Sequence, residues 1–446
     1  MARLPIERFT SLGDDIAPNF NLSIEGQDAG KGRSLFEAVR PLVDSVSIEY
    51  DEQEATLFEL VIINQPEEAV INVGGFGSPV NWHAVLDSKA FQEGNAIDLY
   101  MGYAGVQRFM GRTEIVKWLP EFGPDGPTSF SIKGMDGRHR MMLGNQFRTG
   151  NKIGAAVGSG RKREKKRKVF YTESDDLIVK RIAEKYGYGV DADAVEPRAK
   201  GSRVQETGTT DWEFLARLAQ INRMDLSVDY DQGSKKNIVR FKTRQDIGSA
   251  IYKFTYNGAD GSLIEASPEF QIKDQSTDVE VLVYDRKRKR IERTVISDPV
   301  PAENVKLSGT GVGDLTAKRE ITVGARVRFS AFGQTFEAIS NQPFKSRKEA
   351  QRFANNYLRE NERELVIMQG RVVGIEDLRP LQVHQIAGLS TRIDGLYRFT
   401  NVRHIQAPGQ IYSCEFTAHR VLKTDIARRK ATSATQDSQV GTQASG

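Results

Sequence analysis

Cysteine is almost absent from this sequence, which has Cys414 alone among 446 residues. One thiol cannot form an intramolecular disulfide, and a cysteine-based zinc site would lack its other ligands. We interpret Cys414, within the strand-like segment 412–416, as a small buried apolar side chain rather than a reactive thiol. Stability must therefore come from packing and assembly.

Long apolar runs are also missing. No stretch approaches the roughly 20 uncharged apolar residues that cross a bilayer. The first residues, MARLPIERFTSLGDD, carry acidic side chains where a secretory signal has an apolar region. We therefore expect no stable membrane insertion, and a chain that starts in the cytoplasm where it is made.

The sequence has no large excess of charge, because 63 basic and 59 acidic side chains give a net charge of +4. This balance does not suggest a dedicated nucleic-acid-binding protein. One local run is strongly basic and follows the Gly-rich segment 145–160. Its basic residues are Arg161, Lys162, Arg163, Lys165, Lys166, Arg167 and Lys168.

Two interpretations of this basic run stay open. Runs of like charge generally form solvated, self-repelling loops. The alternative is contact with nucleic acid or an acidic partner, although only Phe170 and Tyr171 stand beside the run as stacking groups. The rest of the chain offers no basic face that would extend it.

Motifs of catalysis and cofactor binding are missing as well. The sequence has no pair of histidines with zincin spacing and no nucleophile serine between glycines. The glycine clusters 73–77 and 308–313 lack the spacing of a phosphate-binding loop. We assign no catalytic residue, metal ligand or cofactor. The five histidines are scattered and are interpreted as structural or surface residues: His83, His139, His384, His404 and His419.

One enzymatic alternative is kept open. The chain has 59 acidic residues, which always offer carboxylate pairs, and a pair at suitable distance cleaves glycosides. A peptidoglycan hydrolase is the enzyme of this class that we keep as an alternative.

Short segments rich in β-branched and aromatic residues predict a mainly β protein with α+β parts. A chain of 446 residues is long enough for about three domains. Strands are predicted at 46–50, 56–63, 96–103, 129–134, 226–230, 238–241, 252–256, 279–284, 365–373, 381–385, 395–404 and 410–418.

Three helices are predicted from residues that are typical of helix ends. Segment 174–187 has Ser174 as a candidate N-cap, and Gly187 suits the left-handed backbone conformation that often follows the C-terminus of a helix. Segments 210–220 and 346–358 each begin with the spacing of a capping box. Trp212 and Phe214 in the second helix are interpreted as core residues, because aromatic residues at helical spacing mostly are.

Changes in composition predict the domain boundaries. They are an N-terminal arm (1–21), a first β domain (22–145), a Gly-rich and basic linker (146–172), a two-helix α+β domain (173–250), a second β domain (251–420) with a polar loop (298–324) and a helix (346–360), and a disordered tail (421–446). The polar segment 191–208 is expected to be a loop.

Three stretches together resemble the phage late control gene D protein family, which includes contractile-tail baseplate hubs and the hub-like part of type VI secretion spike proteins. The most specific is TDWEFLARLAQINRM at 210–224, with Trp212, Glu213, Phe214 and Leu215. The second is the helix at 176–187. The third is GLYRFTNVRH at 395–404, with Gly395, Tyr397 and His404.

The resemblance implies two tail-tube-like antiparallel β-barrel domains in each chain, and a homotrimeric ring with pseudo-sixfold symmetry. It implies a structural, non-enzymatic hub in the virion tail baseplate. The implied partners are the trimeric spike, the tail tube or its initiator, the tape measure protein and the baseplate wedge. DNA would pass through the channel without specific binding.

Overall fold

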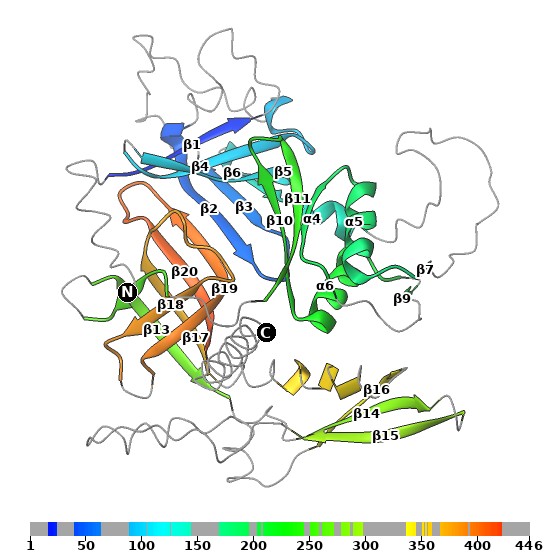
Figure 1. Ribbon diagram of the computed structural model, residues 1–446. Helices are drawn as coiled ribbons and strands as arrows, with labels where there is room; N and C mark the ends of the chain where they lie inside the picture. The colour runs from blue at the N-terminus through cyan, green and yellow to red at the C-terminus, as the bar shows by residue number, and fades with distance from the viewer. Residues whose placement is uncertain are drawn as a thin grey trace, which may run out of the picture. The chain divides into compact units, whose positions relative to one another are not determined.

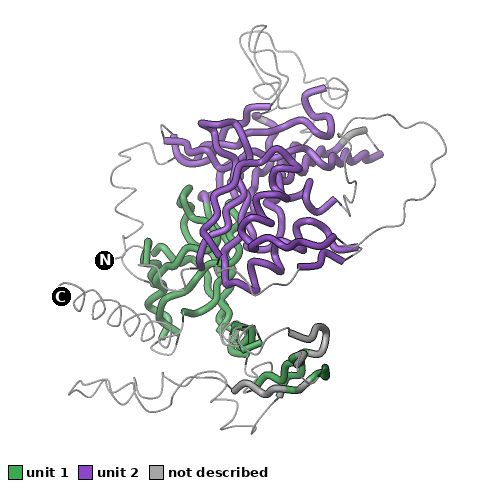
Figure 2. The backbone as a smooth tube through the Cα atoms, turned by 45° about the vertical axis from the view of Figure 1, so that its right-hand side comes forward, with its two compact units in different colours: residues 1–16, 245–404, 413–446 green, residues 17–244, 405–412 purple. Residues whose placement is uncertain are grey.

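The computed structural model of the chain describes residues 17–24, 40–63, 89–104, 106–124, 126–143, 169–195, 203–206, 208–244, 250–257, 261–271, 278–285, 289–297, 336–344, 350–351, 353–354, 356–358, 366–390 and 393–421. The chain divides into two compact units, coloured separately in Figure 2. Unit 1 comprises Met1–Ile16, Gln245–His404 and Ser413–Gly446, and unit 2 comprises Ala17–Arg244 and Ile405–Tyr412.

Unit 2 contains an antiparallel sheet with the strand order β1-β4-β5-β6-β3-β2 (Figure 1). Short 3-10 helices at Arg40–Leu42 and Lys89–Phe91 precede β2 and β4. The strands are β1 (Pro18–Ile24), β2 (Val43–Asp51), β3 (Leu57–Ile63), β4 (Ala96–Tyr103), β5 (Val106–Gly123) and β6 (Gly126–Met135). The four strands predicted in this region from composition are confirmed.

Buried and partly exposed residues alternate along β3, which explains why these residues form a sheet with one buried face. Phe58, Leu60 and Ile62 are fully buried, while the residues between them are only partly covered. Successive side chains of a strand point to opposite faces, so every second apolar residue enters the core. Pro18 opens β1, which pairs with β4 from its first residue.

The long strand β5 was not predicted, because bulges break its alternation. Tyr100 of β4 lies opposite Phe109 and Leu99 lies opposite Gly111, which leaves Met110 as an extra residue. Met110 and Ile115 are both buried although they are five residues apart, a spacing that a regular strand does not give. The period-two signal is therefore lost in the sequence.

The described residues of unit 2 also form three α-helices and two small sheets. The helices are α4 (Arg138–Met142), α5 (Asp175–Lys185) and α6 (Asp211–Asn222). Strands β10 (Met224–Asp231) and β11 (Lys236–Thr243) are antiparallel, and β8 (Gly189–Ala192) joins β11 in parallel. Strands β7 (Val169–Tyr171) and β9 (Arg203–Gln205) form a separate pair. The predicted helices at 174–187 and 210–220 are confirmed.

Helices α5 and α6 bury their apolar faces in one core with β10 and β11. Ile178, Ile182 and Leu215 are fully buried in it, together with Val239 and Phe241. Each buried side chain of this size contributes about 1.5 to 3 kcal/mol relative to exposure. The core therefore fixes both helices on the sheet.

The ends of the helices partly follow the prediction. Thr210 and Glu213 form the capping box of α6, since Thr210 Oγ1 accepts from Glu213 N at 3.1 Å and Glu213 Oε2 accepts from Thr210 N at 2.7 Å. Gly187, at φ +73°, follows α5 in the left-handed region. Ser174 occupies the N-cap position of α5 as predicted, but its side chain makes no capping hydrogen bond.

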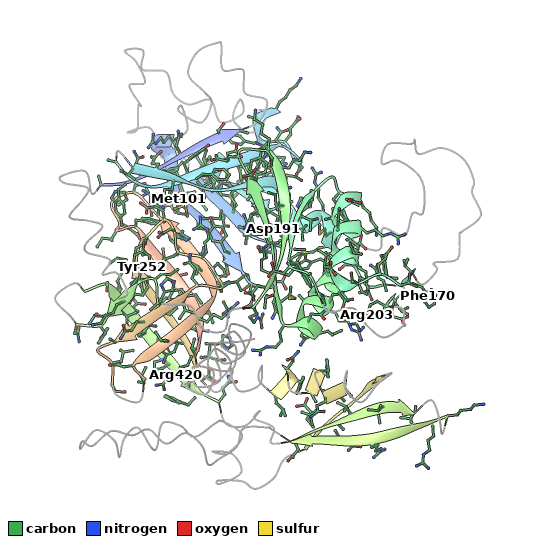
Figure 3. All side chains as sticks on the ribbon, in the orientation of Figure 1. Met101, Phe170, Asp191, Arg203, Tyr252 and Arg420 are labelled. Atoms are coloured by element: carbon green, nitrogen blue, oxygen red, sulfur yellow. The ribbon has the colours of Figure 1, made fainter. Side chains whose placement is uncertain are left out.

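The expected loop at 191–208 contains a strand, so that prediction was wrong in part. β9 lies within it because Arg203 is anchored to the start of α5 by two hydrogen bonds to Asp175, at 3.2 and 3.0 Å. Val204 of β9 lies opposite Phe170 of β7. Phe170 and Arg203 are labelled in Figure 3. An anchoring contact between distant residues leaves no local signal.

In unit 1 the described strands follow the order β19-β20-β17-β13. β18 pairs with β19 in antiparallel fashion and with β12 in parallel. The strands are β12 (Lys253–Thr255), β13 (Leu263–Phe270), β17 (Val366–Val373), β18 (Val383–Ala387), β19 (Gly395–Gln406) and β20 (Ser413–Arg420). The strands predicted over 365–418 are confirmed, and the mainly β fold class with them.

A three-stranded sheet of order β15-β14-β16 comes between β13 and β17 in the sequence. Its strands are β14 (Asp278–Asp285), β15 (Arg290–Ser297) and β16 (Phe336–Phe344). The described residues from 350 to 358 are helical, as predicted, and Ala350, Ala354 and Leu358 pack on Val279 and Val281 of β14.

Several predictions concern residues outside the described ranges. These are the arm up to residue 16, the basic run 161–168, the glycine clusters 73–77 and 308–313, the polar loop 298–324 and the tail after residue 421.

Candidate functional site

Trp212, the most specific motif residue, connects α6 to the turn between β2 and β3. Its side chain is 4% exposed, and its Nε1 donates a hydrogen bond to the carbonyl oxygen of Gln53 at 2.8 Å. The Arg138 guanidinium lies 5.6 Å from the centroid of a Trp212 ring. A cation over an indole is attracted by the electron density of the ring face.

Arg138 is itself buried, and each of its three guanidinium nitrogens donates a hydrogen bond. Its Nε donates to Asp136 Oδ2 at 2.8 Å, its Nη2 to Thr56 Oγ1 at 2.8 Å, and its Nη1 to the carbonyl oxygen of Asp51 at 2.9 Å. Thr56 N also donates to Asp136 Oδ2, at 3.1 Å. We call Trp212, Arg138, Asp136 and Thr56 the junction network. It joins the β2–β3 turn, the end of β6, α4 and α6.

The start of α6 holds a second buried carboxylate, Asp211. It accepts hydrogen bonds from Gln205 Nε2 at 2.8 Å, Tyr186 Oη at 2.9 Å and Lys185 Nζ at 3.3 Å. Burial and then the negative charge of Asp211 raise the pKa of Tyr186 well above its ordinary value. Tyr186 therefore stays a neutral donor at physiological pH.

The other residues of this motif pack or cap. Phe214 is buried and stacks on Tyr171 with ring centroids 5.4 Å apart. Burial raises the pKa of Tyr171 to about 12. Leu215 is fully buried, and Glu213 serves the capping box. The prediction that Trp212 and Phe214 are core residues is confirmed.

The second motif group lies on β19 of unit 1. Tyr397 is fully buried, and its hydroxyl donates to the carbonyl oxygen of Ile393 at 2.7 Å. Burial raises its pKa to about 12. A Cβ on Gly395 would lie 3.2 Å from Nε of Arg420, so the absence of a side chain there lets that guanidinium lie close to the strand.

His404 and Cys414 form a buried pair. The ring atom Nε2 of His404 lies 3.0 Å from the carbonyl oxygen of Leu378, so it must carry the hydrogen and donate. Nδ1 is then an acceptor, and Sγ of Cys414 lies 3.2 Å from it. Both side chains are fully buried, so Cys414 is a core residue as predicted, with a polar partner that was not predicted.

His384 on β18 is buried among aromatic rings. Its ring centroid lies 4.5 Å from Phe399, 5.6 Å from Phe254 and 5.9 Å from Tyr252. Neither ring nitrogen has a hydrogen-bond partner among the described residues. Burial lowers the pKa of His384 to about 3. The imidazole is therefore neutral and packs as an aromatic ring.

No family model matches the sequence, and no curated protein matches it either. Solved structures do match. A tail protein from Neisseria meningitidis MC58 aligns with 91% of this chain and 99% of its own, at 12% identity and a TM-score of 0.58. The 43 kDa tail protein of prophage MuSo2 from Shewanella oneidensis aligns with 91% and 98%, also at 12% identity and a TM-score of 0.58.

The chain has the fold of a phage tail protein. Prophage tail protein gp18 from Listeria monocytogenes EGD-e aligns with 92% of this chain and 98% of its own, at 11% identity and a TM-score of 0.50. The resemblance to the gene D late control family, drawn from short motifs, is thus confirmed at the level of the fold.

The phage tail fold separates the motif residues into two clusters. Trp212, Glu213, Phe214 and Leu215 lie in unit 2, while Gly395, Tyr397 and His404 lie in unit 1. Sequence reasoning missed Arg138, Asp136 and the burial of His384. The spacing of Asp136 and Arg138, directly after a predicted strand, is a weak signal for such a pair.

The described residues show no group of three or more His, Cys, Asp or Glu side chains that could hold a metal ion. None of the described helices is both long and apolar enough to span a membrane.

The buried histidines predict a pH dependence of stability. Burial, with the charge of Arg379 as a second cause, lowers the pKa of His404 to about 3, as burial alone does for His384. In the unfolded chain both pKa values return to about 6.5. Between pH 6.5 and 3 the unfolded chain binds protons that the folded chain does not. Stability is therefore full above pH 6.5 and falls as pH drops, by about 1.4 kcal/mol per unit for each histidine.

Urea unfolding followed by circular dichroism at several pH values measures this slope. His384→Phe and His404→Gln are expected each to remove one histidine's share, about 2 kcal/mol between pH 7.5 and pH 5. His404→Gln keeps a donor for the Leu378 carbonyl. Variants that retain the full slope of the wild type would show that these imidazoles do not cause it.

Proposed function

We propose that this chain is the structural hub of a contractile phage-tail baseplate, or of a related injection device, and joins the central spike to the tail tube. The observation that supports this best is the phage tail fold, which extends over 91% of the chain and nearly all of two tail proteins. The hub acts by position and holds no catalytic residues.

Ring formation is the physical basis of the proposal. Each unit carries a mainly antiparallel set of strands, so three copies of the chain supply six such sets, a number that suits a hexameric tube. We propose that 22–145 and 251–420 are the two tube-like barrel domains and that the homotrimer has pseudo-sixfold symmetry. A closed ring satisfies strand edges and cannot grow into a fibre.

The edge strand β1 is a suitable contact between copies. In the described strand order β1 is the terminal strand and pairs with β4, and we propose that a neighbouring copy adds a strand at its other edge. The trimeric spike would bind one face of the ring, and the tail tube or its initiator the other. The tape measure protein and the baseplate wedge are further proposed partners, and DNA would pass through the channel.

Electron-microscopy class averages of the chain co-expressed with spike and tube candidates test the proposal. We expect threefold rings with an open channel. The double variant Asn21→Lys, Ser23→Lys adds charge to the exposed side of β1 and is expected to reduce the fraction of rings. Thr172→Lys, Gln220→Lys adds the same charge at exposed positions away from β1. A compact monomer that binds neither the spike candidates nor the tube candidates would contradict the proposal.

A further inference from the structure

One end of unit 2 brings together three segments that lie far apart in the sequence. Tyr103 at the end of β4 and Tyr412 before β20 are both buried, and their ring centroids lie 5.6 Å apart. Ala104 N donates a hydrogen bond to the carbonyl oxygen of Ala17, directly before β1, at 2.8 Å. Val106 lies opposite Tyr103 in the register of β4 and β5. The start of β1, the β4–β5 turn and the β19–β20 connection therefore lie together.

This end of unit 2 exposes apolar side chains. Ile411 is 73% exposed, the largest fraction for a large hydrophobic side chain among the described residues, and Val106 is 41% exposed. Ala17, Pro18 and Pro408 are exposed as well. Exposed apolar residues that gather at one place on a soluble protein are typical of an interaction surface.

The same end carries no charge. Segments 17–18, 103–104, 106–107 and 405–412 contain no Asp, Glu, Lys or Arg, although 27% of the whole chain is charged. We call these four segments the neutral end. Arg108 on β5 is exposed at its border. A neutral, partly apolar centre with charged residues around it is the arrangement found in protein–protein interfaces.

A tight turn holds the side chain of Ile411 outward. Gln410 N donates a hydrogen bond to the carbonyl oxygen of Ala407 at 3.1 Å. Pro408 restricts the second position of this turn, and Gly409, at φ +71°, occupies the third, where a type II turn requires a positive φ. The tyrosine that follows Ile411 is fully buried and anchors the other side. Because the backbone is already ordered, a partner that binds here pays little conformational entropy.

We propose that the neutral end is the surface through which the hub holds the trimeric spike, against an uncharged apolar surface of that partner. The inference rests on the proposed function and names the part of the chain that performs it. The described residues place one neutral end in each chain, so a homotrimer presents three. Three equal sites match a partner with threefold symmetry, whereas a hexameric tube requires six.

The position of the neutral end favours the spike over a neighbouring copy of the chain. A copy that adds a strand to β1 lies beside that strand, along the direction of the hydrogen bonds between strands. The neutral end consists of turns and strand ends, which point across that direction and stay accessible when a ring closes. Anionic lipids and DNA attract lysine and arginine, and the neutral end has neither.

Co-purification of the full chain with an affinity-tagged spike candidate, in the presence of tube candidates, tests the inference. The variant Val106→Lys, Ile411→Lys places two ammonium groups in the contact. We expect the amount of chain recovered with the spike to fall about tenfold or more, because an unpaired charge is costly to bury. Threefold rings in class averages should remain, and circular dichroism should show an unchanged fold, since both side chains are exposed.

The matched control is Phe170→Lys, Leu177→Lys, which charges two exposed apolar side chains of β7 and α5. It should change spike recovery by less than about twofold. Equal recovery of the Val106→Lys, Ile411→Lys variant and the wild type, with rings present, would overturn the inference and leave the hub proposal standing. Loss of the rings or of the tube candidate in place of the spike would overturn it too. A wild-type chain that forms no rings and binds no spike candidate would contradict both.

Discussion

Replacing Trp212 by alanine is expected to lower the free energy of unfolding by about 3 to 5 kcal/mol. The side chain is 4% exposed, so its removal leaves a cavity between α6 and the β2–β3 turn. The substitution also leaves the Gln53 carbonyl without its indole donor and Arg138 without the ring beneath it. Urea unfolding followed by circular dichroism measures the change.

Two further variants separate the causes. Trp212→Phe keeps most of the apolar volume and removes the indole N–H, so its cost should be about 1 to 2 kcal/mol. Trp118→Ala removes the same residue type where the side chain is 36% exposed, and should cost less than half as much as Trp212→Ala. An unchanged unfolding curve for Trp212→Ala would mean that the junction around this side chain is not formed in solution.

Replacing Arg138 by methionine is expected to cost about 3 to 5 kcal/mol, because it leaves a buried carboxylate without its cation. Asp136 is 7% exposed and would keep only backbone donors, from Thr56 N and from residue 138. The hydroxyl of Thr56 and the carbonyl of Asp51 would also lose their donor. Chemical unfolding of the full chain measures the loss.

A double-mutant cycle tests this explanation. Asp136→Asn combined with Arg138→Met removes the buried charge while keeping an acceptor for Thr56 N, so the pair should recover about 1 to 3 kcal/mol of the single-variant loss. Arg240→Met is the matched control, since Arg240 is 47% exposed in its ion pairs with Asp229 and Asp191 and should cost less than about 1 kcal/mol. Simple additivity of the two substitutions would rule out the proposed coupling of Asp136 with Arg138.

The sequence predicted those parts of the fold whose signals are local. The capping box of α6, the left-handed exit at Gly187 and the regular strands are each encoded by neighbouring residues. The long strand β5 escaped prediction because its bulges break the alternation. The order and spacing of short motifs were enough to indicate the phage tail fold.

The candidate site was predictable only for its motif residues. Trp212 was expected in the core, but its hydrogen bond to Gln53 joins positions 159 residues apart, and no local pattern encodes that partner. The burial of Arg138 and His384 depends in the same way on strands and helices brought together by folding. Polar side chains are normally exposed, so residue type alone predicts that Arg138 and His384 are exposed, whereas both are buried.

The buried thiol of Cys414 can serve as a built-in reporter of local opening in unit 1. The protein has a single thiol, it is fully buried, and it lies on β20 against His404. A thiol reagent can reach it only when this strand separates from its neighbours, so the labelling rate measures how often the sheet of unit 1 opens under native conditions. Because the protein has no second thiol, all labelling comes from Cys414 on β20. The labelling rate can therefore also be measured inside a large assembly, where the unfolding curves of different proteins overlap.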